Sequence, residues 1–283
     1  MPRIALVTDS TACLSAASAA AHGVTAVPLE VIVRGAPHSE ADPATGELLV
    51  AALRAHETAT TSRPTPEDFA AAYRAAAEGG AQGVVSLHIS AELSATLESA
   101  ELAAKDAPIP VRVLDSRTIG MALGFSVLAA AEAGRDGEHD LDAVAEIAAK
   151  RSATASAFFY VDTLEYLRRG GRIGSARALL GSALAMKPLL HMADGRVEPL
   201  EKVRTSAKAI ARLEEIAVER AGGDGNSVEI AVQHLDAAER AEILAARLQE
   251  RLPGLNGITV CEVGAVIGAH VGPGVLGVIV APG

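Results

Sequence analysis

The chain has 283 residues, 49% of them hydrophobic and 2% aromatic, with a formal net charge of -10 at pH 7. This length suits two domains, whereas the acidic balance and the scarcity of rings argue against a nucleic-acid-binding protein. No apolar run approaches the ~20 residues of a membrane helix, and no signal-peptide cleavage pattern follows the first residues. We therefore expect a cytoplasmic protein without stable membrane insertion.

The first predicted strand, residues 3–8, ends at Asp9 and Ser10 and leads into a helical stretch. In α/β folds ligands collect beyond such strand ends, but either polar side chain could equally cap the helix. The next apolar run, 24–33, predicts a second strand. A loop over 35–47 and a helix ending near residue 56 should follow it.

Hydroxyl groups gather in the segment 60–66, which the prolines at its end should hold extended. Pro66 suits the first turn of a helix that continues to residue 78. Thr61 and Ser62 could therefore be ordinary caps and turn formers or could face a ligand, and the residues alone leave both open.

The run 83–90 predicts a third strand, after which Ser90 to Thr96 should open a helix. A carboxylate near Ser94 would meet the free N–H groups and the dipole of that helix. His88 lies inside the apolar strand, which is typical of a core histidine.

A fourth strand over 110–116 and helices over 118–133 and 140–155 complete this pattern. Four repeats of strand and helix predict an N-terminal α/β domain, residues 1–150, with a mostly parallel sheet flanked by helices. Asp115 and Ser116 could line the cleft or cap the next helix.

A second α/β domain is predicted for residues 151–283. It contains a short helix, three arginines around Gly170 and Gly171, a helix near 178–185 and a hairpin over 189–200 with an Asp-Gly turn. Alternating helices and strands follow, and the hairpin implies a mixed sheet with antiparallel pairs. The glycine-rich segment 264–274 interrupts this alternation and should expose the imidazole of His270.

Arg168, Arg169 and Arg172 have two interpretations. Cations at a helix end are favoured by the dipole and are usually solvated. Three guanidinium groups beside paired glycines can also hold a phosphate or carboxylate.

Sequence motifs for independent catalysis are missing. The chain has no nucleophile elbow, no Walker loop and no metal-type cluster, and its two cysteines, Cys13 and Cys261, should be buried free thiols. A binding protein without metal or cofactor is therefore favoured. A stand-alone hydrolase or kinase of a small hydroxylated metabolite, using His270 as base, stays open.

Six segments in order resemble the DegV family of bacterial lipid-binding proteins, which includes the fatty-acid-binding subunit of fatty acid kinase. They are TDSTACL (8–14), TSRPTPEDF (61–69), HISAELSATLESA (88–100), VLDSRTIGMALGF (113–125), DTLEYLRRGGRIGSARALLGSALAMKPLL (162–190) and GAVIGAHVGPGVLGV (264–278). The resemblance implies a two-domain DegV-like fold that holds a long-chain fatty acid in the cleft between the domains.

The same resemblance assigns site residues. It implies that the fatty-acid carboxylate is bound by Thr61, Ser62, Ser94 and His270. It also implies that a separate ATP-dependent kinase phosphorylates this carboxylate, with Arg172 and Arg204 serving phosphoryl transfer or partner docking. A lipid carrier or sensor without a kinase partner stays open. The helix 176–186 could line a tunnel for the tail or pack into the core.

Five positions depart from the family pattern. Cys13 replaces an acidic residue, and Ala95 replaces glycine beside the expected ligand serine. Arg63 replaces glutamine, and its cation could lie near the site or point into water. Ala269 and Val271 replace the threonines that commonly flank the histidine, which removes two hydroxyl groups.

Overall fold

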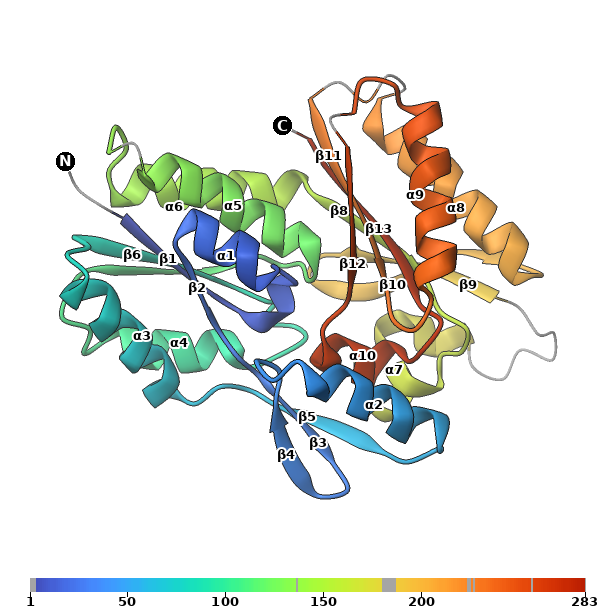
Figure 1. Cartoon of the computed structure of the whole chain (residues 1–283), viewed down its shortest axis with the longest axis horizontal. Coiled ribbons are helices and arrows are strands. Elements are labelled where there is room, and N and C mark those ends of the chain that lie inside the picture. The colour runs from blue at the N-terminus through green and yellow to red at the C-terminus, as the bar shows by residue number, and fades with distance from the viewer. Residues whose placement is uncertain are drawn as a thin grey trace.

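A computed structural model describes residues 4–135, 137–179, 187–222, 225, 227–255 and 257–282. Three sheets organise the chain (Figure 1): a four-stranded sheet, a six-stranded sheet, and a three-stranded sheet where the two larger halves meet. Among the described residues, no helix is both long and apolar enough to cross a membrane.

The four-stranded sheet is parallel throughout, as predicted, with the order β2-β1-β6-β7. Its strands are β1 (Ile4–Asp9), β2 (Val24–Val27), β6 (Gly83–His88) and β7 (Val111–Asp115). Helices α5 (Met121–Arg135) and α6 (Leu141–Thr154) cover one face, and α3 (Pro66–Glu78) and α4 (Thr96–Ala104) cover the other. The short helices η1 (Ser10–Ala12) and α1 (Ala16–His22) connect β1 to β2.

The order of the strands indicates where a ligand would bind this sheet. From β1 the chain first moves outward to β2, and it later returns to the opposite side of β1 as β6. The carboxyl ends of β1 and β6 therefore flank the point where the winding of the sheet reverses, which is where open α/β sheets bind ligands. Asp9 and His88 end these two strands.

The prediction of one strand over 24–33 and a loop after it was wrong. Pro28 lacks the N–H that would continue a ladder, and the chain changes sheets there. An antiparallel sheet of order β4-β3-β5 follows, formed by β3 (Glu30–Val33), β4 (Ala36–Ser39) and β5 (Ala59–Ser62). Arg34 and Gly35 both have positive φ, as a tight hairpin turn requires. Helix α2 (Ala44–Arg54) packs beside this sheet.

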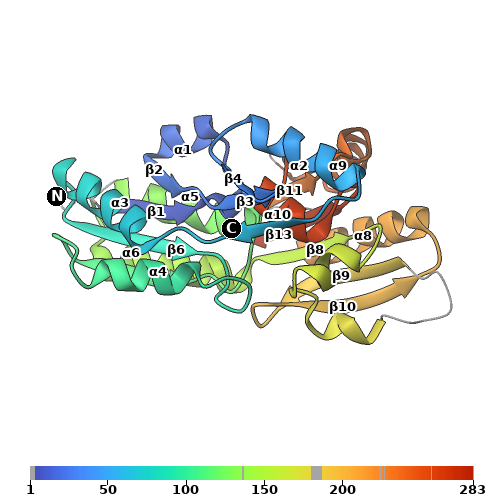
Figure 2. The ribbon, with the colours of Figure 1, turned by 90° about the horizontal axis from the view of Figure 1, so that it is seen from below.

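The six-stranded sheet is mixed, with the order β10-β9-β8-β13-β11-β12 and only β11 and β12 parallel. Its strands are β8 (Ser156–Tyr160), β9 (Lys187–Ala193), β10 (Arg196–Val203), β11 (Val228–His234), β12 (Ile258–Glu262) and β13 (Leu276–Pro282). Helices α8 (Ser206–Ala221) and α9 (Ala238–Arg251) cover one face, and Figure 2 shows the two large sheets end to end. The antiparallel pairing was predicted.

The β9–β10 hairpin joins the two halves of the molecule. Asp194 and Gly195 form its predicted turn, both with positive φ. The Ser90 hydroxyl donates to the carbonyl of Gly195 at 2.7 Å, and Arg117 donates to the carbonyl of Asp194 at 2.8 Å. The hairpin therefore holds the loops that follow β6 and β7.

Three further predictions need correction or fall outside the described residues. Residues 90–95 form a turn, so α4 begins at Thr96 rather than at Ser90. The segment 264–274 contains a helix, α10 (Ala265–Val271), which ends at Gly272, where the φ of 78° favours glycine. Of the helix predicted near 178–185, only the end of a 3-10 helix, η2 (Gly174–Leu179), is described; residues 180–186, and most of the proposed tunnel helix, are not.

Candidate functional site

A cavity of about 420 Å³ lies where the three sheets meet. Its walls come from the loop after β6, from β5, from α10 and from one face of the six-stranded sheet. Five of the six predicted site residues line this cavity: Thr61, Ser62, Ser94, Arg172 and His270. Arg204 does not line it; this side chain is exposed in the bend after β10.

Thr61 and His270 are in direct contact. Strand β5 presents the Thr61 hydroxyl, whose oxygen lies 3.0 Å from Nε2 of His270 in the last turn of α10. Burial, and then the nearby positive charge of Arg172, lower the pKa of His270 from 6.5 to about 4. The imidazole is therefore neutral at physiological pH.

The surroundings of the imidazole select its tautomer. Nδ1 is buried without a hydrogen-bond partner among the described residues, and it lies so close to Gly170 that a Cβ there would be 2.0 Å away. A buried donor without an acceptor is costly. The favourable tautomer therefore carries its proton on Nε2 and donates to Thr61 Oγ1, which leaves the Thr61 proton free for a ligand.

Ser94 lies at the start of α4. Its Oγ contacts Thr96 Oγ1 at 2.8 Å and accepts from the Thr96 N–H at 3.3 Å. Ala95, the N-cap residue, has no side chain that could cap the helix and itself lines the cavity. Ser94 therefore makes a capping contact to α4 and also places a hydroxyl at the cavity wall.

Ser62 and Arg63 extend this polar wall. The Ser62 hydroxyl donates only weakly, to the carbonyl of Arg63 at 3.3 Å. Arg63 donates to the Ala95 carbonyl at 3.2 Å and to Glu98 at 3.0 Å. The cation that departs from the family pattern is thus turned toward the first turn of α4, beside the cavity.

The three clustered arginines separate into two groups. Arg168 and Arg169 pair with Glu165 one turn earlier on α7 (Glu165–Arg169), and these bonds lower the pKa of that carboxyl to about 2. They match the interpretation of a solvated helix end. Arg172 instead donates to the carbonyls of Leu93 at 2.9 Å and Gly170 at 2.6 Å, at the exposed edge of the cavity.

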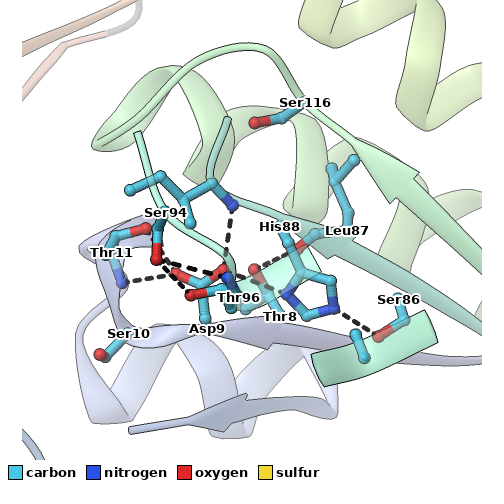
Figure 3. Close-up of polar contacts among 12 residues, drawn as sticks. Thr8, Asp9, Ser10, Thr11, Ser86, Leu87, His88, Ser94, Thr96 and Ser116 are labelled. Carbon is cyan, nitrogen blue, oxygen red and sulfur yellow. Dashed lines mark hydrogen bonds and ion pairs between the residues drawn. The ribbon is translucent and has the colours of Figure 1, made fainter. Parts of the chain in front are cut away.

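A second polar cluster lies beside Ser94 and Thr96 (Figure 3), and its side chains, those of Asp9, Ser86, His88 and Tyr73, do not line the cavity. The buried carboxylate of Asp9 accepts from Thr11 N–H at 3.1 Å, Ile89 N–H at 3.0 Å and His88 Nδ1 at 3.1 Å. His88 Nε2 contacts Ser86 Oγ at 2.7 Å, and that oxygen contacts the Tyr73 hydroxyl at 2.8 Å. The core position predicted for His88 is confirmed. Of the alternatives left open for Asp9, the capping role holds for η1, whereas α1 is capped by Ser15.

Glu40 was missed by the sequence analysis. Its carboxylate accepts from the Ser10 hydroxyl and from the N–H of Val266 at 2.8 Å, so it caps α10 in place of the missing side chain of Gly264. Burial is the main cause that raises the pKa of Glu40. No motif could reveal this contact, because Glu40 lies in a polar loop far from α10 in sequence.

Gln233, also missed, fixes the cavity floor to α5. Its Oε1 accepts from Met121 N–H at 2.9 Å, and its Nε2 lies 3.7 Å from Cys261 Sγ. Cys13 and Cys261 are free thiols, and burial raises the pKa of Cys13 to about 12. Within the described residues no group of three or more His, Cys, Asp or Glu side chains could hold a metal ion.

Comparisons with known proteins agree with this architecture. Residues 3–283 match the family described as "Uncharacterised protein, DegV family". A DegV domain-containing protein of Streptomyces coelicolor is 58% identical over 277 residues, which cover 98% of each chain.

Two solved structures share the fold over nearly the full length. One, titled as fatty acid binding of a DegV family protein from Thermus thermophilus, has a TM-score of 0.91 at 36% identity and covers 99% of each chain. The other, described as DegV, a fatty acid binding protein from Bacillus subtilis, has a TM-score of 0.90 at 33% identity and covers 100% of each chain.

Proposed function

We infer that this chain, which belongs to the DegV family, binds a long-chain fatty acid with its carboxylate at the polar end of the cavity and its tail against the six-stranded sheet. The observation that carries this proposal is the composition of one cavity. Hydroxyls from β5 and the β6–α4 turn meet the imidazole of α10, and most of the other lining side chains are apolar, apart from Arg63, Arg172 and Gln233. The related proteins described as fatty-acid-binding support the same ligand class.

The polar end offers donors that a carboxylate can accept. When the Nε2–H of His270 donates to Thr61 Oγ1, the hydroxyl proton of Thr61 can point at the ligand. Ser62 and Ser94 supply two further hydroxyl donors. A buried carboxylate without such donors would be very costly. A neutral imidazole is sufficient, so binding needs no protonated histidine.

The tail supplies most of the attraction. At ~0.8 kcal/mol per buried CH₂, a fourteen-methylene tail gains about 11 kcal/mol before entropic losses, whereas a charge-assisted hydrogen bond contributes about 1.5 to 3 kcal/mol. The cavity therefore sets affinity mainly through its apolar walls, and the hydroxyls set the orientation of the ligand. No cofactor is required beyond the bound fatty acid.

Lipid extraction tests this function. We expect mass spectrometry of purified protein to detect fatty acid near one equivalent per chain. An empty protein that turns over a hydroxylated metabolite alone would favour the enzyme alternative. That alternative lacks support from the site, because a histidine with a pKa of about 4 is a poor general base at neutral pH.

We also propose that the bound carboxylate is presented to a separate ATP-dependent kinase, which would form an acyl phosphate. Arg172 lies at the exposed edge of the cavity, where positive charge could stabilise the transferring phosphoryl group. Arg204 lies outside the cavity, so its role would be in docking the kinase.

The kinase proposal predicts different losses for two measurements. Arg172→Ala and Arg204→Ala should keep fatty acid binding nearly intact and lower the phosphorylation rate in an assay with the cognate kinase. Rates equal to the wild type would leave both arginines as ordinary surface cations worth at most ~1 kcal/mol. In that case a carrier or sensor without a kinase partner becomes the better proposal.

A further inference from the structure

Two cross-strand rows of the six-stranded sheet form the floor of the cavity, which is apolar apart from Gln233. Phe159, Gly277 and Gln233 lie opposite one another on β8, β13 and β11. Ala157 and Ile279 stand in the next row on the same face, two residues along their strands. All five residues line the cavity, and Gly277 is the one among them without a side chain.

Neither the backbone nor the packing of the protein requires glycine at position 277. Its φ is not in the left-handed region, and an added Cβ would meet its nearest atoms at ordinary contact distances: Phe158 O at 3.6 Å, Phe159 Cβ at 3.7 Å and Gln233 Cβ at 3.8 Å. These atoms belong to the neighbouring strands of the same sheet, so the space above Gly277 is open to the cavity. Gly120, also at the cavity wall, differs because it has a φ of 67° and Gln233 Oε1 would lie 2.4 Å from its Cβ.

A glycine inside a strand weakens the sheet and commonly marks a position that a ligand approaches closely. The hydroxyls and the imidazole of this cavity come from β5, from the β6–α4 turn and from α10, whereas Gly277 belongs to the six-stranded sheet. A tail that extends from a carboxylate bound at those groups can therefore pack along the sheet. Gly277 is the position of this floor where the absence of a side chain leaves the most room for it.

We propose that Gly277 is a specificity-determining residue that sets the longest tail the cavity accepts. The tail crosses β13 at Gly277, and the space left by the absent side chain is filled by its distal methylenes. This inference rests on the proposed function, since it assumes that the cavity binds fatty acids. It assigns the length limit to one position of the sheet.

A series of substitutions tests the proposal. Affinities for saturated fatty acids from decanoate to stearate would be measured by calorimetry for wild type, Gly277→Ala, Gly277→Val and Gly277→Leu. In wild type each added methylene should raise affinity about fourfold until the cavity is full. Gly277→Leu should bind decanoate as wild type does and bind stearate about tenfold or more weakly, with Ala and Val between them.

Gly46→Leu is the matched control. Gly46 lies on α2 with no atom within 4 Å of an added Cβ, so this exchange adds the same side chain away from the cavity and should keep the wild-type length profile. Thermal unfolding of every variant identifies any that fold poorly, and Gly277→Ala adds too little volume to disturb the sheet.

The outcomes separate the two proposals. If wild type binds fatty acids and Gly277→Leu has the same chain-length profile, the role of Gly277 is wrong but the proposed function stands. The same conclusion follows if Gly277→Leu loses equal affinity for decanoate and stearate. Wild-type protein that binds no fatty acid of any length overturns the proposed function and this inference together.

Discussion

Two histidines, His88 at the end of β6 and His270 in the last turn of α10, differ in how many of their ring nitrogens form hydrogen bonds. His88 is fully buried, and both of its ring nitrogens have partners within the protein, Asp9 and Ser86. Among the residues that the structure describes, His270 has one side-chain partner, Thr61, and Nδ1 has none. A polar cluster whose donors all bond to acceptors within the protein, such as that of His88, stabilises the fold. A polar cluster that leaves a hydroxyl proton without an acceptor in the described part of the chain, such as that of His270 and Thr61, can donate to a ligand.

The largest expected effect is on the closed cluster. Asp9→Ala should lower the free energy of unfolding by about 3 to 5 kcal/mol, because it leaves the buried donors of Thr11, Ile89 and His88 without an acceptor. Urea unfolding measures this loss. A change below ~1 kcal/mol would show that the cluster is not a structural support.

The lowered pKa of His270 should make the stability of the protein depend on pH. The folded protein holds the pKa of His270 near 4, against 6.5 in an unfolded chain, so the unfolded chain takes up this proton first as pH falls. Above pH 6.5 His270 is neutral in both states and does not lower the free energy of unfolding. As pH falls from 6.5 towards 4, the free energy of unfolding should decrease by at most about 3 kcal/mol because only the unfolded chain binds this proton.

Unfolding curves of wild type and His270→Gln, measured across this pH range, isolate the contribution. The difference in unfolding free energy between the two proteins should change with pH between 4 and 6.5. Parallel curves would mean that the imidazole titrates normally in the folded protein.

The hydroxyls should affect affinity more than stability. Ser94→Ala should weaken fatty acid binding by about 1 to 3 kcal/mol, because a buried charged acceptor loses a donor, and combination with His270→Ala should weaken it further. Circular dichroism should stay unchanged. A fatty acid methyl ester serves as control, since it carries no carboxylate and should lose less affinity.

The smallest effect is expected at Ser62, whose hydroxyl already makes a weak bond to the Arg63 carbonyl. Ser62→Ala should cost less than ~1 kcal/mol of affinity. An equal loss for Ser62→Ala and Ser94→Ala in the same titration would contradict the ranking and move the carboxylate closer to β5.

Much of the fold could be predicted from local pattern, and the site only in part. The parallel strands follow from long apolar runs that end in polar residues. Strand β4 could not be found this way, because its Ala-Pro-His-Ser sequence has no alternation and its pairing depends on the turn at Arg34. Arg172 separates from Arg168 because Gly171, with a φ of 72°, ends α7 and turns the chain back.

The contacts that sequence could not supply join distant segments. Thr61 meets His270, and Glu40 reaches the N-terminus of α10. Residue types at those positions predict caps or surface charges, and only the arrangement of the three sheets makes them part of one site. The resemblance to a known family pointed to the hydroxyls and to His270. It did not point to Glu40, whose carboxylate caps the helix that carries His270.

The central place of β13 has a consequence for folding kinetics. Val278 pairs with Phe158 on one side and with Val232 on the other, so β8 and β11 each keep an open edge until β13 inserts between them. Loop closure over such sequence separations is slow, and open strand edges invite association with other chains. Refolding at high protein concentration should therefore compete with aggregation through β8 and β11, and dilution should raise the yield of active protein.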